Sequence, residues 1–228
     1  MRLSAQDVLY EDNHLLVVNK PAGLLVQGDK TGDETLADLA KAYIKEKYNK
    51  PGDVFLGVVH RIDRPVSGVV VLARTSKALE RLNASFRDRK VEKEYWALVQ
   101  NRPPQVKGHC EHWIRKNRNI NKSVAQNKPG KGALKSTLDY ELIGRIAGYY
   151  LLDVHPETGR PHQIRVQLAK IGCPIAGDLK YGAPTKSNDG RIYLHSKEII
   201  FPHPVKKENV RITAGLPNDQ VWQMFKGI

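Results

Sequence analysis

The sequence predicts an α+β protein with a large mixed or antiparallel sheet. Segments with strand-like alternation outnumber helical ones, and several adjoin across short turns, as the strands of hairpins do. The regular alternation of strand and helix that is typical of parallel α/β folds is missing. Because the 228 residues contain no internal repeat and no low-complexity linker, residues 1–228 are expected to form one domain.

In the first half of the chain, two short strands are expected in VLYEDNHLLVVNK, around a turn at Asp12-Asn13. A helix follows in TLADLAKAYIKEKY, because its apolar residues recur at helical spacing and Thr35 is a suitable N-cap. Strands should flank the stretch VHRIDRPVSG. Ser76 is expected to cap a second helix that ends near Arg87, and VEKEYWALVQ alternates as a strand does.

The second half begins with residues 101–133, which are polar and rich in Lys, Asn, Gly and Pro. We expect them to form a basic, exposed insertion with a possible strand at HCEHWIRK. A hairpin should turn near Ala147-Gly148, and PHQIRVQLAKIG should form a helix with Pro161 in its first turn. Two further strands, IYLHSKEIIF and VRITA, precede a short helix from Pro217 to about Phe225.

Charge and composition favour a partner that is a polyanion. Lysine and arginine total 37 against 24 acidic residues, which gives a formal charge of +13 and a pI of about 9.7. Nucleic acid is the commonest such partner, because phosphate contacts release counterions. No apolar run is long enough to span a bilayer and the N-terminus lacks a signal core, so we expect a cytoplasmic protein without a membrane partner. The two cysteines should be reduced thiols.

One carboxylate, Asp63, lies between two arginines in VHRIDRPVSG. By itself, an Asp at a strand end is more often a turn residue than a catalyst. A glycoside hydrolase would need a second acid, and no pattern points to one. A protein kinase loop is disfavoured, because Ile62 separates Asp63 from His-Arg and Gly68 occupies the place of the required Asn.

A metal site is also disfavoured. His109, Cys110 and His112 are close in sequence, but on a strand the two histidines point to opposite faces.

Four separated motifs favour a catalytic role for Asp63 over that of a turn residue: HRIDRPVSGVVVLARTSKAL, KVEKEYWALV, ETGRPHQIRVQLAKIGCPIAGDLKYG and LHSKEIIFPHP. In order and spacing they resemble the RluA-type family of pseudouridine synthases, from about Asp12 to Ala214. The resemblance implies a bent sheet flanked by helices, with a central basic cleft. It also implies isomerisation of uridine in RNA: the bond from C1′ to N1 breaks, the base turns, and C1′ joins C5. No cofactor and no metal is implied.

The resemblance assigns three catalytic residues. Asp63 is the nucleophile or acid-base group, and a single carboxylate suits an isomerisation that activates no water. Arg165 is expected to pair with Asp63 and keep it charged. Tyr95 is expected to stack on the target base and to serve in proton transfer at C5, whereas Trp96 should point to the opposite face, into the core.

Other residues are assigned to the substrate. Arg61 is expected to help displace the target nucleotide from its stack, and His60 to hold the loop in place by hydrogen bonding. Ile192 and Leu194 match the segment that lines the uracil pocket, although core packing explains them equally well. Val66 replaces a threonine that is frequent in the family, with little expected effect because Ser67 remains.

Many relatives carry an N-terminal S4-type RNA-binding domain, whereas here about ten residues precede the first expected strand. RNA binding is therefore expected to rest on the catalytic domain, with the basic segment Lys107 to Lys135 as a candidate for backbone contacts. Ribosomal and transfer RNA both stay open as targets, and a monomer is expected. The alternative is a non-catalytic RNA-binding or assembly protein on the same fold.

Overall fold

The computed structural model describes residues 2–187 and 189–228, and the contacts of the chain divide it into two compact units. The first unit runs up to Glu92 and takes in Ser196–Gly215, and the second contains Lys93–His195 and Leu216–Ile228. The chain therefore passes between the units after Glu92, His195 and Gly215. Each unit has its own apolar core.

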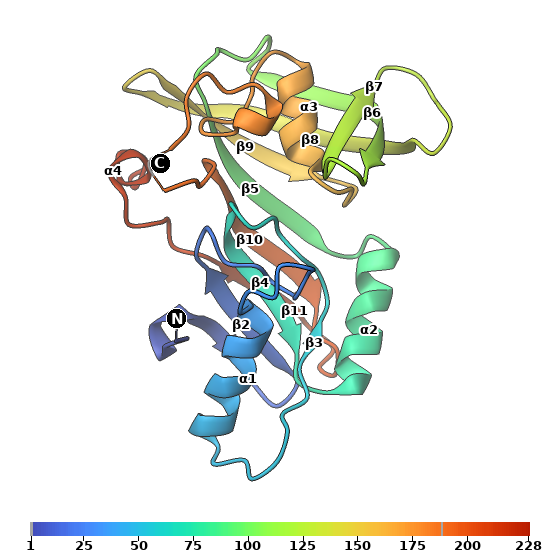
Figure 1. Cartoon of the computed structure of the whole chain (residues 1–228), viewed down its shortest axis with the longest axis vertical. Coiled ribbons are helices and arrows are strands. Elements are labelled where there is room, and N and C mark those ends of the chain that lie inside the picture. Colours follow the sequence, from blue (N-terminus) through green and yellow to red (C-terminus); the bar gives the residue numbers. More distant parts are fainter. Residues whose placement is uncertain (1, 188) are drawn as a thin grey trace. The chain divides into compact units, whose positions relative to one another are not determined.

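The first unit is a sheet with two helices (Figure 1). Its strands follow the order β1, β2, β4 and β10, with β3 also paired to β4 and β11 paired to β10. The strands are β1 (Val8–Glu11), β2 (Leu15–Lys20), β3 (Gly57–Val58), β4 (Ser67–Ala73), β10 (Leu194–Pro202, in this unit from Ser196) and β11 (Asn209–Thr213); the helices are α1 (Leu36–Lys47) and α2 (Ser76–Arg87).

The apolar core of this unit lies between the sheet and α2. Every residue of β4 is buried, which explains the uninterrupted apolar run that follows the Asp63 motif. Val69 and Val71 of β4 belong to one buried cluster together with Leu82 of α2 and Phe201 of β10. The two strands around Asp12-Asn13 pair antiparallel, as the sequence predicted. The stretch that carries Asp63 is therefore attached to a rigid central strand.

Capping explains where the two helices begin. Thr35 caps α1, as predicted, and forms a reciprocal capping box with Asp38. The prediction for α2 was wrong by one residue: Thr75, not Ser76, is the N-cap, and its side chain accepts a hydrogen bond from the N–H of Ala78. Thr75 still has an extended backbone, which is the conformation that an N-cap residue requires.

The second unit is an antiparallel sheet in the order β5, β9, β8, β6 and β7. Helix α3 lies against β6 and β7 (Figure 1). The hairpin between β8 and β9 turns at Ala147-Gly148, as predicted, with positive φ at both residues. The elements are β5 (Glu92–Val99, in this unit from Lys93), β6 (Lys107–Asn117), β7 (Lys122–Gln126), β8 (Leu134–Ile146), β9 (Tyr149–Pro156), α3 (Gln163–Lys170) and α4 (Gln220–Gln223).

Residues 101–133 are mostly exposed, and they contain the strand expected at HCEHWIRK as part of β6. About half of the segment forms β6 and β7, and β6 pairs with β8 over eight residues, so these strands are part of the sheet. Ile114 and Ala125 are buried and pack with Val166 and Tyr181. The polar residues that suggested an insertion occupy the other face of the hairpin and its tip.

Two helices are shorter than predicted. α3 begins at Gln163 instead of Pro161, because His162 before it has a left-handed backbone (φ 55°) that no helix continues. α4 covers only Gln220–Gln223, with Asp219 as its N-cap. The longest helices, α1 and α2, have 12 residues each, and none of the helices in the described parts of the chain could cross a membrane.

Candidate functional site

The seven residues that the sequence assigned to the site fall in both units. Three lie in the first unit and four in the second, and each group is described by itself. Those of the first unit are His60, Arg61 and Asp63, and those of the second are Tyr95, Arg165, Ile192 and Leu194.

The Asp63 loop connects β3 to β4. Ile62 and Val66 are buried at 7% and 2% exposure and anchor the loop, and the N–H of Val66 donates to the carbonyl of Asp63 at 3.0 Å to close a turn. Asp63 is half-buried, whereas Arg61 is exposed. The loop thus buries its apolar side chains and leaves a carboxylate and a cation at the surface of the unit, which suits contact with a substrate.

His60 supports this loop from within the unit. Its Nε2 accepts a hydrogen bond from the N–H of Val71 at 3.0 Å, and its ring stacks on Phe86 at 5.0 Å between centroids. These contacts link the loop to β4 and to α2, and they agree with the loop-holding role that we expected for His60.

Arg64, to which the sequence assigned no role, joins the Asp63 loop to the segment after β2. Its Nε donates to the carbonyl of Gly23 at 2.9 Å, and its Nη1 lies 2.7 Å from Asp33. The N–H of Gly23 donates in return to the carbonyl of Arg64 at 2.7 Å. The loop is therefore held from both sides by hydrogen bonds in addition to its buried residues.

Gly68 at the start of β4 explains why the motif contains a glycine. Its φ is +112°, a conformation that L side chains rarely adopt, and an added Cβ would overlap the backbone of Ser196. Only glycine lets β4 approach β10 this closely directly after the Asp63 loop.

In the second unit, Arg165 has a partner that the sequence did not reveal. Arg165 is 5% exposed, and its Nε and Nη2 donate to the two carboxylate oxygens of Asp178 at 2.7 and 2.9 Å. Its guanidinium also lies 5.1 Å from the ring centroid of Tyr181. This two-point ion pair and the aromatic face hold the guanidinium in one orientation. Asp178 lies in the GDLKYG part of one of the four motifs. The motif therefore contained this residue, but it did not indicate that Asp178 pairs with Arg165.

Tyr181 connects this arginine to the β6–β7 hairpin. Its hydroxyl oxygen accepts the N–H of Ser123 at 2.7 Å and lies 2.8 Å from Nδ1 of His162, directly before α3. Burial raises the pKa of Tyr181, which keeps the phenol protonated and able to donate. The start of α3, the hairpin and Arg165 are thus joined through one side chain.

The remaining assigned residues of this unit are Tyr95, Ile192 and Leu194. Tyr95 is half-buried on β5, and its neighbour Trp96 is 7% exposed in an apolar cluster with Trp222, so the predicted core role of Trp96 is confirmed. Ile192 and Leu194 are both 4% exposed. Their burial is compatible with core packing and with an apolar pocket wall alike.

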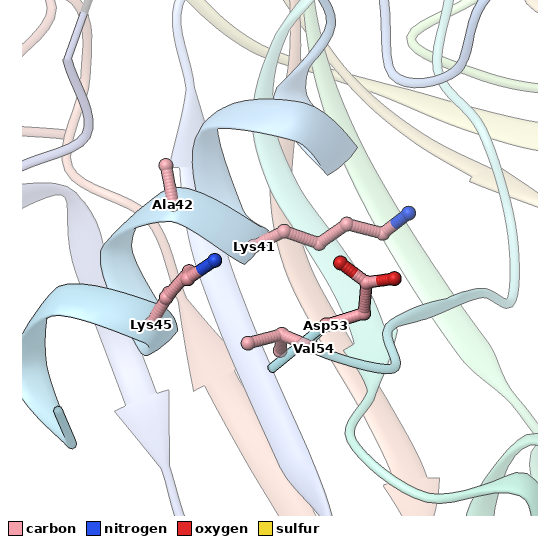
Figure 2. Close-up of a pocket in the computed structure, with 5 residues that line it drawn as sticks. All are labelled: Lys41, Ala42, Lys45, Asp53 and Val54. Carbon is pink, nitrogen blue, oxygen red and sulfur yellow. The ribbon is translucent and has the colours of Figure 1, made fainter. Parts of the chain in front are cut away.

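Two surface pockets lie away from these residues. One, of about 360 Å³, is lined by α1 and the segment before β3, where the Lys41 and Lys45 side chains extend towards Asp53 (Figure 2). The other, of about 380 Å³, lies over β6 and β8 and is lined by residues such as His109 and Tyr140. None of the seven assigned residues lines either pocket, so neither pocket defines the site.

His109 and His112 are oriented as predicted. On β6, His109 is exposed and His112 is buried, so the two rings do point to opposite faces. Cys110 and Cys173 are free and buried, and burial raises the pKa of Cys110 to about 11, which makes its thiol a poor nucleophile.

The fold and the Asp63 loop define a protein of the pseudouridine synthase class. The solved structure named Human RNA Pseudouridylate Synthase Domain Containing 4 superimposes with a TM-score of 0.80, at 26% identity, over 97% of this chain and 92% of that one. The chain belongs to the RNA pseudouridylate synthase family, whose model matches residues 14–170.

Curated relatives of the chain are also named pseudouridine synthases. Ribosomal large subunit pseudouridine synthase C of Buchnera aphidicola is 34% identical over 217 residues, which are 92% of this chain and 66% of the relative. Ribosomal large subunit pseudouridine synthase D of Zymomonas mobilis is 32% identical over 93% of this chain and 70% of its own length. The chain thus spans about two thirds of the length of the curated relatives it matches.

Proposed function

We propose that this chain isomerises specific uridines of RNA to pseudouridine and that Asp63 is the essential catalytic group. The observation that carries the proposal is the position of Asp63, half-buried in a loop that hydrogen bonds hold to β4 and to the segment after β2, within a chain of this family. The formal charge of +13 supports a polyanionic substrate.

The proposed reaction needs one carboxylate and no water. The bond from C1′ to N1 of the target uridine breaks, the uracil turns, and C1′ bonds to C5. The proton on C5 leaves and N1 gains one, so that nothing is added or lost. Asp63 either attacks the nucleotide and is later released, or accepts and returns a proton. The reacting bond is inaccessible in a stacked helix, so the nucleotide has to leave the stack first.

The other assigned residues take supporting roles in this proposal. Arg165 serves the same reaction as a cation that favours the charged form of Asp63, and its clamp by Asp178 suits a group that has to keep one orientation. Tyr95 stacks on the uracil and participates in proton transfer at C5. Ile192 and Leu194 are candidates for the apolar wall around the base.

RNA contacts are proposed for Arg61 and for the β6–β7 hairpin. Arg61 is exposed beside Asp63, where a cation can hold the phosphate of a displaced nucleotide. The exposed residues Arg115, Lys116 and Arg118 at the end of β6 can contact the phosphate backbone without reading sequence. Because curated relatives are named ribosomal large subunit synthases, large-subunit ribosomal RNA is the first target to test.

The test is a direct assay for pseudouridine. Wild type and Asp63→Asn are incubated with large-subunit ribosomal RNA and with transfer RNA transcripts, and the isomerised positions are mapped chemically. We expect product with wild type and none with Asp63→Asn, while circular dichroism and RNA affinity are unchanged. Near wild-type turnover by Asp63→Asn would remove Asp63 from the mechanism. RNA binding by wild type without isomerisation of any RNA would favour a non-catalytic binding protein.

A further inference from the structure

Lys20 is a buried cation directly behind the Asp63 loop. It is the last residue of β2, and its side chain has no exposed surface. In the antiparallel pairing of β2 with β4, Lys20 lies opposite Gly68, where the chain leaves the Asp63 loop and enters β4. Lysine is almost never fully buried unless it is paired, so this position requires a physical explanation.

Backbone carbonyls surround the ammonium group. Its Nζ donates to the carbonyl oxygens of Pro21 and Leu24, both at 2.8 Å, and to that of Arg64 at 3.3 Å. An ammonium has three protons, and these contacts match them one for one. Pro21 and Leu24 follow β2, whereas Arg64 is the residue after Asp63. The lysine therefore ties the segment after β2 to the Asp63 loop.

The charged groups that act on Lys20 are Asp63 and Arg64. The pKa of Lys20 is lowered to about 7: burial lowers it most, the negative charge of Asp63 opposes this effect, and the positive charge of Arg64 adds to it. This interaction is mutual: the negative charge of Asp63 favours the charged form of Lys20, and the positive charge of Lys20 favours the charged form of Asp63. Because the side chain is buried, Lys20 cannot touch an RNA substrate and can act only through the loop.

We propose that Lys20 is a positioning residue for the isomerisation: its ammonium holds the Asp63 loop through the carbonyl of Arg64 and favours the charged carboxylate from inside the unit. This inference rests on the proposed role of Asp63. Lys20 would thus be a second cation, besides Arg165, that acts on Asp63, and it belongs to the same unit as Asp63.

Four variants test this role. Lys20→Met and Lys20→Gln remove the charge and keep a side chain of similar length, whereas Lys20→Arg keeps the charge. Lys77→Met removes an exposed lysine from α2 as a control.

The first measurement is kcat/KM for pseudouridine formation from pH 9 down to the lowest pH at which the variants stay folded by thermal unfolding. We expect the acid limb of the profile to move up by about one pH unit in Lys20→Met and Lys20→Gln, so that the loss relative to wild type grows towards tenfold as the pH falls along the limb and disappears at higher pH. Lys20→Arg and Lys77→Met should keep the wild-type acid limb. Folded neutral variants with an unmoved acid limb would overturn the proposal.

The second measurement needs no activity and no neutral variant of Lys20. The side-chain nitrogen of Lys20 is titrated by nuclear magnetic resonance in wild type and in Asp63→Asn, with assignment from Lys20→Arg. Coupling between the two groups requires a lower pKa of Lys20 in Asp63→Asn, and an equal pKa in both proteins would overturn the proposal even if no neutral variant folds. An inactive wild type that still shows the coupling would locate the failure in the proposed function instead.

Discussion

Arg165 illustrates how a single residue depends on its surroundings. An arginine on a helix is usually exposed, and a surface ion pair contributes little to stability. Here the guanidinium is buried, and Asp178 and Tyr181 fix its orientation. A buried pair of this kind is costly to break, because the remaining charge is left without compensation. Asp178 is therefore expected to matter for both folding and activity.

We predict that Asp178→Asn destabilises the protein by about 3 kcal/mol, because an amide replaces one accepting oxygen with a donor that faces the guanidinium. Pseudouridine formation should fall in kcat more than in KM, since a mispositioned Arg165 does not alter RNA binding elsewhere. Urea unfolding and steady-state kinetics measure the two effects. Glu141→Gln, which breaks an exposed ion pair with Lys107, serves as the matched control with a change below about 1 kcal/mol. Equal stability of both variants would contradict the prediction.

At the scale of elements, the Asp63 loop is positioned by the strands and segments around it. β4 is buried along its whole length, and β2, β3 and β10 pair with it. Gly68 permits the close approach of β4 to β10 at the end of the loop. The loop is thus anchored at a point where neither strand has room to move.

We predict that Gly68→Ala destabilises the protein by roughly 3 kcal/mol or more, because alanine is strained at this φ and its Cβ meets the backbone of Ser196. The free energy of unfolding in urea measures the effect. Gly28→Ala is the control, since an added Cβ at Gly28 meets nothing within 4 Å and its φ is not positive. A Gly68→Ala protein as stable as Gly28→Ala would mean that β4 and β10 can separate at this point at little cost.

At the scale of the whole molecule, segments from the two ends of the sequence are joined in the first unit. Asp12, in the turn between β1 and β2, accepts hydrogen bonds from the N–H groups of His14 and Leu15, both at 2.8 Å. Its other carboxylate oxygen lies 2.8 Å from Nε2 of His203, between β10 and β11. Nδ1 of His203 accepts two backbone N–H groups, so Nε2 carries the proton and donates to Asp12.

This contact makes stability depend on pH in a defined direction. Burial alone would raise the pKa of Asp12, but the hydrogen bonds from His14, His203 and Leu15 outweigh it and lower the pKa to about 2. A carboxylate whose pKa is lowered on folding stabilises the protein at pH values above its pKa in the unfolded chain, which is near 4. This contribution disappears as the pH falls towards 2.

We therefore predict that Asp12→Asn lowers the free energy of unfolding by about 1 to 2 kcal/mol at pH 7 and by progressively less between pH 4 and pH 2. Urea unfolding across this range measures the difference from wild type. Asp53→Asn, which alters an exposed carboxylate, should change stability by less than about 0.5 kcal/mol throughout. A destabilisation by Asp12→Asn that does not vary with pH would show that shape, not charge, matters at this position.

Local signals explain how much of the fold was predictable. The strands around Asp12-Asn13, the helix capped by Thr35 and the turn at Ala147-Gly148 depend on neighbours within a few residues, and the structure has them as predicted. The packing of the hairpin within residues 101–133 depends instead on distant residues, because its buried face is completed by α3 and by Tyr181.

For the candidate site, the sequence by itself determined which side chains we propose for the chemistry, because residue type and spacing within a motif are properties of the chain alone. Only the tertiary structure decided what surrounds them. Asp178 reaches Arg165 from 13 residues away, and Lys20 reaches the carbonyl of Arg64 from 44 residues away. Contacts between such distant residues are set by strand order, register and packing, and burial gives these charges the strength that no local pattern encodes.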